Sequence, residues 1–167
     1  MIAFKSKKFR VKVERVRLPD GDSVDFAMVE RRPGTSIIPF IDSDTILLAY
    51  QYRPAVGRWI LNLAGGTVEE SETPMQNAVK ELEEELGYRA RRMRLVAKLY
   101  PAPYMCNQTE YIFVATGLVK AKRHLERGEQ IRTRRIRVRD AIRMARTGRI
   151  SDAITAAALM MLEHGLK

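Results

Sequence analysis

The chain has 167 residues, a formal net charge of +10 and one cysteine. This length suits one domain with a substantial core, and no apolar run comes near the roughly 18 residues that indicate a membrane span. One cysteine excludes an intramolecular disulfide, and the basic first residues lack the apolar stretch of a signal peptide. We therefore expect a cytoplasmic protein.

The positive charge is concentrated in one segment. Twelve of the 30 Lys and Arg residues lie within residues 120–149, against three acidic residues. Such a strip attracts polyanions, namely nucleotides, nucleic acid or an acidic partner. We favour the alternative, a solvated Arg-rich surface of the kind found in heat-adapted proteins. The rest of the chain is close to neutral, so the net charge says little about an active site.

Periodicity and turn residues predict many strands and few helices. The predicted strands are residues 9–18, 23–31, 35–41, 44–52, 58–63, 92–100, 109–118 and 130–138. The predicted helices are residues 74–86, 138–147 and 151–164. Arg134 and Arg135 interrupt the alternation of the last strand and predict a bulge. Ser151 is the expected N-cap of the last helix. The pattern indicates an α/β fold with mixed strands, but periodicity alone does not decide its topology.

The helix predicted over residues 74–86 has clear ends. Thr73 suits the N-cap, Gln76 completes a capping box, and Gly87 suits the position that ends the helix. Apolar residues at helical spacing predict a buried stripe formed by Met75, Val79, Leu82 and Leu86.

The same helix carries a cluster of acids. At about 100° per residue, Glu81, Glu84 and Glu85 share one face outside that stripe, whereas Glu83 points to solvent. Neighbouring carboxylates repel one another, and a cation would relieve the repulsion. Oxygen ligands favour Mg²⁺, for which Mn²⁺ can substitute. An isolated acidic run is usually a solvated surface. The glycine pair before this helix favours a ligand site instead, because a bare backbone allows close approach.

These residues follow an order that resembles the Nudix hydrolase signature, G-x5-E-x7-R-E-U-x-E-E-x-G-U, where U is aliphatic. The matching residues are Gly66, Glu72, Glu81, Leu82, Glu84, Glu85 and Gly87. Lys80 replaces the family's Arg, and Tyr88 replaces an aliphatic residue. The resemblance implies a Nudix fold, in which a mixed β-sheet lies between helices. Residues 35–167 would form the hydrolase domain, and residues 1–34 an additional N-terminal antiparallel β-hairpin.

The resemblance also implies roles for individual residues. Glu81 and Glu85 would be the main metal ligands, Glu84 a further ligand or a water-orienting carboxylate, and the Gly65 carbonyl would face a metal. Glu72 would pair with Lys80 and hold the loop, although Lys80 lacks the planar fork of an arginine. The implied reaction is hydrolysis of a nucleoside diphosphate linked to another moiety.

Three further segments resemble ADP-ribose pyrophosphatases, namely residues 51–66, 100–104 and 148–153. Pro103 lies about 16 positions past the last glycine of the signature, as in that subfamily. This resemblance implies hydrolysis of ADP-ribose to AMP and ribose 5-phosphate. Arg53 would bind a phosphate or the terminal ribose. The general base would come from the loop at residues 124–129, with Glu129 as first choice and Glu126 as second.

Adenine requires an aromatic or apolar platform. The candidates are Trp59, Tyr104 and Phe26, with core packing as the alternative for Trp59 and Phe26. Gly66 and Pro103 are further candidates for substrate contact. In the subfamily the N-terminal sheet exchanges between subunits, which implies a homodimer here. A two-stranded hairpin is marginal by itself, so it must dock on something.

Two alternatives stay open. The first is a Nudix enzyme with another substrate, such as a sugar nucleotide, NADH, a dinucleoside polyphosphate or a capped RNA. The Arg-rich segment would support RNA, although a nucleotide sugar is favoured over nucleic acid. The second is a Nudix scaffold that binds a nucleotide without catalysis, for which Lys80 is the only hint.

Overall fold

The computed structural model describes residues 1–162. The strands are β1 (Ile2–Lys5), β2 (Arg10–Arg17), β3 (Ser23–Glu30), β4 (Gly34–Pro39), β5 (Thr45–Arg53), β6 (Arg58–Asn62), β7 (Tyr88–Leu99), β8 (Glu110–Lys120) and β9 (Ile131–Arg137). The helices are the 3-10 turn η1 (Pro54–Val56), α1 (Pro74–Leu86), α2 (Val138–Arg146) and α3 (Ala153–Leu162). No helix in residues 1–162 combines the length and the apolar character needed to cross a membrane.

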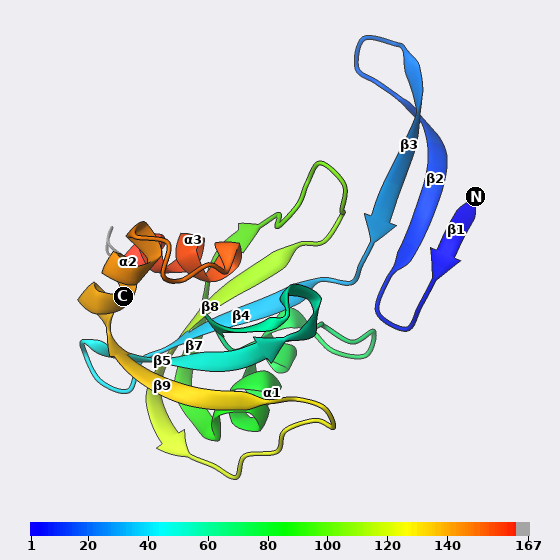
Figure 1. Cartoon of the computed structure of the whole chain (residues 1–167). Helices are drawn as coiled ribbons and strands as arrows, with labels where there is room; N and C mark the ends of the chain where they lie inside the picture. The colour runs from blue at the N-terminus through cyan, green and yellow to red at the C-terminus, as the bar shows by residue number, and fades with distance from the viewer. Residues whose placement is uncertain (163–167) are drawn as a thin grey trace.

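An N-terminal antiparallel sheet stands apart from the other strands (Figure 1). Its order is β1-β2-β3, and β2 pairs with β3 without interruption from Arg10–Glu30 to Arg17–Ser23. The predicted hairpin over residues 9–31 is therefore present. The sequence did not predict β1, because its four residues are all exposed and show no apolar alternation. The sheet joins the rest of the chain where Val29 exchanges backbone hydrogen bonds with the loop before β8, donating to the Met105 carbonyl over 2.7 Å.

The remaining strands form two sheets that lie together. One has the order β4-β8-β7, with β4 parallel and β7 antiparallel to β8, and the other is the antiparallel set β6-β5-β9. Backbone bridges between Ile37 and Ala64 and between Phe40 and Ile46 connect them. The mixed sheet predicted from the family resemblance is thus confirmed.

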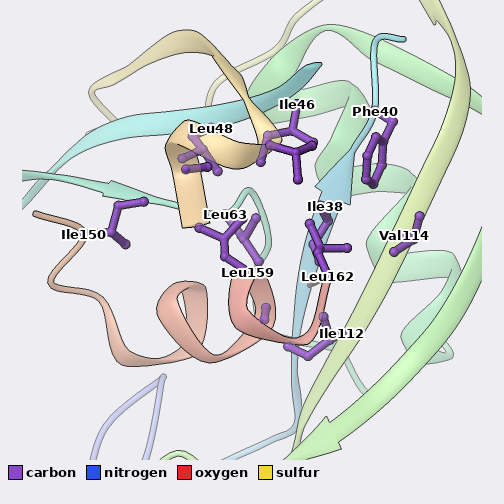
Figure 2. Packing of buried hydrophobic residues seen from close by; sticks show 13 residues of the cluster. Ile38, Phe40, Ile46, Leu48, Leu63, Ile112, Val114, Ile150, Leu159 and Leu162 are labelled. Atoms are coloured by element: carbon purple, nitrogen blue, oxygen red, sulfur yellow. The ribbon is translucent and has the colours of Figure 1, made fainter. Parts of the chain in front are cut away.

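Successive residues are buried in β4, in the middle of β5 and in the first half of β8, so both faces of these stretches are covered. One hydrophobic cluster lies beneath α2 and α3 and includes Ile38, Leu48 and Leu159 (Figure 2). The other lies beneath α1 and includes Ile37 and Leu82. The helices therefore cover opposite faces of these strands (Figure 1), as the predicted fold requires.

Four details differ from the sequence predictions. The pairing of β5 with β9 is continuous from Thr45–Arg137 to Gln51–Ile131, so the bulge predicted at Arg134 and Arg135 is wrong. Strand β7 begins directly after Gly87, earlier than predicted. Asp152 rather than Ser151 caps α3, because its Oδ1 accepts a hydrogen bond from the Thr155 N–H over 2.8 Å. The predicted stripe on α1 is also partly wrong, since Met75 and Val79 are 38% and 45% exposed. The predicted end of the last helix, at residue 164, lies outside the described residues.

Candidate active site

Helix α1 begins and ends as its sequence predicts. Thr73 accepts a hydrogen bond from the Gln76 backbone, and the Gln76 side chain accepts one from the Thr73 N–H over 2.8 Å, which completes the capping box. Gly87 adopts the left-handed conformation at the C-terminal end, with φ of 72°. These two caps determine where the helix begins and where it ends.

Asn77 attaches the glycine loop to the helix and to β4. Its Oδ1 accepts a hydrogen bond from the Thr35 hydroxyl over 2.5 Å, and its Nδ2 donates to the Thr67 carbonyl over 3.0 Å. The Gly66 carbonyl accepts a backbone hydrogen bond from Thr35 over 2.9 Å. The loop is therefore held between the strand and the helix, and its backbone is presented in one conformation.

Two glycines allow the loop to lie against its neighbours. Gly65 has φ of 153°, and a side chain there would overlap the Thr35 carbonyl. A side chain at Gly66 would overlap the carboxylate of Glu81. The Gly65 N–H donates to Glu85 Oε2 over 2.9 Å. Close packing of backbone against carboxylates thus requires both glycines.

Glu81 and Glu85 are the two acids that α1 turns toward this loop. Burial, opposed by the charge of Lys80 and supported by the charges of Glu84 and Glu129, raises the pKa of Glu81 to about 7. Burial likewise raises the pKa of Glu85 to about 8, partly offset by the Gly65 N–H. Glu85 is only 2% exposed. A place outside the apolar stripe predicts an exposed helix face for this residue, and that prediction is wrong. Relative to the orientation that the predicted apolar stripe requires, the helix is turned about its axis so that Glu85 faces the glycine loop.

This donor set fits a hard divalent cation. Its oxygen ligands suit Mg²⁺ or Mn²⁺, and Mg²⁺ typically takes one or two carboxylates together with substrate phosphates and water. A cation would also relieve the repulsion between two desolvated carboxylates. Within residues 1–162, no three Asp, Glu, His or Cys side chains converge into a ready-made metal cluster.

Glu72 and Lys80 form the ion pair that the sequence predicts, with 2.7 Å between Glu72 Oε1 and Lys80 Nζ. The pair connects the segment before α1 with the helix itself. Glu83 lies elsewhere and pairs with Arg89 over 2.6 Å, in agreement with its predicted place outside the site.

A cleft of about 500 Å³ opens beside these groups, which is a volume typical of small-molecule sites. Eight of the predicted site residues line it, namely Arg53, Gly65, Gly66, Lys80, Glu81, Glu85, Glu126 and Glu129. Glu126 and Glu129 come from the loop between β8 and β9. Glu129 Oε2 accepts a hydrogen bond from the Glu126 N–H over 3.0 Å. This loop is attached to α1 where His124 donates to the Glu84 carbonyl over 3.1 Å.

The other predicted residues lie outside the lining of this cleft. Glu72 is the ion-pair partner of Lys80, which does line the cleft. Glu84 lies on α1, and its charge helps to raise the pKa of Glu81. Tyr104 is 76% exposed on the loop before β8, which also carries the exposed Pro103. Phe26 lies on β3 in the N-terminal sheet.

Trp59 belongs to an aromatic and basic cluster on the other face of β5 and β6. Its ring stacks on Tyr50 at 5.3 Å, and the Arg132 guanidinium lies 4.7 Å from its centre. Trp59 pairs in register with Tyr52, whereas the cleft is lined by the alternate residues Gln51 and Arg53. Part of the Arg-rich segment thus packs on aromatic rings.

Sequence reasoning missed two groups of lining residues. The first is basic and consists of Lys7, Lys8, Arg31 and Arg32. The second is polar and buried and consists of Ser36, Gln51, Asn62, Gln108, Glu110 and Thr155. A signal for the second group exists, because Gln51 and Asn62 interrupt otherwise apolar strands. The first group has no comparable signal, since it depends on where the N-terminal sheet lies.

The fold and the cleft define a class of protein in which a glycine loop and a helix that carries several glutamates line the same cleft. Residues 30–157 match the NUDIX domain family. The chain belongs to this Nudix family, and it resembles the ADP-ribose pyrophosphatases within it. This confirms the family predicted from the signature and the prediction of a hydrolytic enzyme.

Relatives cover nearly the whole chain. An ADP-ribose pyrophosphatase of Bacillus subtilis (strain 168) is 28% identical over 96% of this chain and 88% of its own length. A CMP-5'-(N-acetyl-N-hydroxy-3-aminopropyl)phosphonate hydrolase of Streptomyces rubellomurinus is 33% identical over 93% of this chain and 75% of its own length. The crystal structure of an ADP compounds hydrolase has a TM-score of 0.85 at 21% identity, covers 99% of this chain and 90% of its own, and shows the same fold.

Proposed function

We propose that this enzyme hydrolyses ADP-ribose to AMP and ribose 5-phosphate in a reaction that depends on Mg²⁺. The observation that carries the proposal is the pair of carboxylates, the half-buried Glu81 and the buried Glu85, against the Gly65–Gly66 backbone in a cleft that basic residues also line. The ADP-ribose pyrophosphatase of Bacillus subtilis, which aligns over 96% of the chain, supports the choice of substrate.

Each group in the cleft has a role that follows from its chemistry. Glu81 and Glu85, with Glu84 and the Gly65 carbonyl, would hold the cation. When bound, Mg²⁺ neutralises phosphate charge and lowers the pKa of a water molecule. Arg53 donates paired hydrogen bonds to a phosphate or to the terminal ribose. Lys7, Lys8 and Arg31 add positive charge around the diphosphate.

The reaction adds one water across the P–O–P bridge. Glu129 takes the proton of the attacking water, with Glu126 as the second candidate, since both line the cleft and both charges reach Glu81. The bridging oxygen leaves on one phosphate, the water oxygen joins the other, and two monophosphates result. The Glu72–Lys80 pair holds the segment that precedes α1, and thereby the glycine backbone beside the acids.

The N-terminal sheet, residues 1–34, is proposed to form a homodimer. Phe26 of one subunit would then help to form the adenine site of the other, with Tyr104 and Pro103 on the exposed loop as further contacts. Sedimentation equilibrium of the full chain tests this proposal. A mass of one chain across the micromolar range would contradict it.

A panel of substrates tests the proposed reaction. ADP-ribose, a sugar nucleotide, NADH, a dinucleoside polyphosphate and a capped RNA are compared at saturating Mg²⁺, with nucleotide release followed by chromatography. We expect AMP release from ADP-ribose with the highest kcat/KM. No release from ADP-ribose at any metal concentration would overturn the proposal, and calorimetry with Mn²⁺ would then identify binding without turnover.

The second candidate is a different nucleoside diphosphate derivative. The hydrolase of Streptomyces rubellomurinus supports it, because that relative is 33% identical and its name specifies a cytidine compound. A CMP-linked substrate in the same panel separates the two candidates. Faster release of CMP than of AMP would favour the second one.

A further inference from the structure

Part of the cleft wall, here called the polar side, is built from polar side chains that are almost completely buried. They are Ser36, Gln51, Asn62, Gln108, Glu110 and Thr155, and none is more than 8% exposed. They come from β4, β5, β6, β8, α3 and the loop before β8. Burial of so many polar groups is costly unless each finds a partner.

Most of these groups satisfy one another. Glu110 accepts hydrogen bonds from the Ser36 hydroxyl over 2.7 Å and from Gln108 Nε2 over 3.3 Å. The Thr155 hydroxyl oxygen accepts one from the Leu63 N–H over 2.9 Å. These contacts hold the wall in one arrangement without any ligand.

Asn62 is the exception. Its Oδ1 is the only buried side-chain nitrogen or oxygen in residues 1–162 that has no hydrogen-bond partner. The residue is 3% exposed, and it lines the cleft three positions before Gly65. A buried acceptor without a partner destabilises the fold, so its retention calls for an explanation.

The orientation of the Asn62 amide follows from its neighbours. Nδ2 donates to the Leu63 carbonyl over 2.7 Å and to Gln51 Oε1 over 3.4 Å. Both partners are acceptors, so reversing the amide would place oxygen against oxygen. The unpartnered atom is therefore an acceptor, and its ligand must be a donor.

The chemistry of the ligand indicates which donor. Phosphate oxygens offer no donor to Asn62 Oδ1, whereas the sugar hydroxyls of a nucleotide sugar do. Glu110 and Asp152 line the same cleft, so the lining holds further acceptors for hydroxyl groups. Burial raises the pKa of Glu110, with a smaller contribution from the charge of Asp152, against the opposing effects of the Ser36 hydroxyl and Arg31.

We propose that Asn62 Oδ1 accepts a hydrogen bond from a hydroxyl of the terminal ribose, so that this wall selects the sugar joined to the ADP moiety. This inference rests on the proposed hydrolysis of ADP-ribose. It assigns Asn62 as a specificity-determining residue rather than a member of the metal site.

The test compares ADP-ribose with analogues whose terminal ribose lacks the 2- or the 3-hydroxyl, in the wild type and in Asn62→Leu, Asn62→Ala and Asn62→Asp. In the wild type, we expect one deoxy analogue to lose about tenfold to a hundredfold in kcat/KM. Asn62→Leu and Asn62→Ala should hydrolyse that analogue and ADP-ribose with the same kcat/KM to within about threefold. Asn62→Asp keeps the acceptor but places a second oxygen against the Leu63 carbonyl, so it should melt at a lower temperature than the wild type while keeping the discrimination.

The outcomes separate the two claims. Equal hydrolysis of all analogues by the wild type, or undiminished discrimination by Asn62→Ala, overturns the inference but leaves the proposed function intact. No hydrolysis of ADP-ribose by the wild type overturns both. Thermal melts of the variants identify any that do not fold, and the wild-type series remains decisive in that case.

Discussion

The two sides of the cleft are built in different ways. The metal side comes from one continuous segment, the glycine loop and α1, whose residues are related by helical spacing. The polar side comes from elements as far apart in sequence as Ser36 and Thr155. On the proposed mechanism, the metal ligands therefore come from a local motif, whereas the general base and the groups that select the substrate come together only in the tertiary fold.

The largest expected effect comes from Glu85→Gln, which removes a proposed metal ligand. We expect turnover to fall by at least about a hundredfold. The fold should persist, because a neutral amide can still accept from the Gly65 N–H. Steady-state kinetics with circular dichroism checks both. Glu83→Gln, on the same helix but paired with Arg89, is the control and should be nearly silent. A comparable loss of turnover in both variants would contradict the proposal that Glu85, but not Glu83, belongs to the metal site.

A pair of glycine substitutions compares the two sides directly. A side chain at Gly66 overlaps Glu81, and one at Gly34 overlaps Glu110 and Gln108. We expect Gly66→Ala to lower kcat about tenfold to a hundredfold, since it displaces a metal-side carboxylate. Gly34→Ala should cost about 1–3 kcal/mol of unfolding free energy and lower kcat less. Steady-state kinetics and urea unfolding of both variants measure these effects. A larger loss of kcat in Gly34→Ala than in Gly66→Ala would contradict the proposal that the metal side carries the metal ligands.

A divalent cation bound by Glu81 and Glu85 should stabilise the fold against unfolding. A cation at about ten times its dissociation constant adds about 1.4 kcal/mol to the unfolding free energy, which corresponds to about 3–6 °C in Tm for a chain of this size. Removal by EDTA should reverse the shift in thermal melts. The double variant with Glu81→Gln and Glu85→Gln should show no shift. A shift of the same size in that variant would place the cation elsewhere.

The smallest effect concerns the basic rim. Lys7→Gln combined with Lys8→Gln should raise KM about threefold to tenfold at low salt, while kcat changes less than about twofold. The reason is that positive charge at the cleft helps to attract an anionic substrate, and salt screens this attraction. Initial-rate measurements at two ionic strengths check this. Lys5→Gln, on the same sheet but outside the cleft lining, is the matched control. Identical KM values in all three proteins would exclude the rim from substrate binding.

The sequence predicted much of the metal side because its residues are contiguous. The caps of α1, the Glu72–Lys80 pair and the glycine positions all follow from short-range rules. The rotation of the helix about its axis did not follow from such rules, since Asn77 and Glu85 make hydrogen bonds with the glycine loop, whose position is a tertiary property. A scale that ranks residues by hydrophobicity assigns Glu85 to solvent, whereas here it is buried.

The strands and their mixed arrangement were also predictable, once the signature indicated the family. The polar side was not, because no spacing rule brings Ser36, Asn62 and Glu110 together. The same holds for Lys7 and Lys8, whose place at the cleft depends on the few hydrogen bonds between Val29 and the loop before β8. Single polar residues within apolar strands are the signal that could have identified Gln51 and Asn62.

The burial of Glu85 has a consequence for engineering. A glutamine at this position would keep an acceptor for the Gly65 N–H and avoid the cost of burying a carboxylate near Glu81 in metal-free buffer. A screen for heat resistance carried out without divalent cations would therefore select against the residue on which activity is proposed to depend. Libraries built on this scaffold should be sorted in the presence of Mg²⁺, with a turnover step following each thermal challenge.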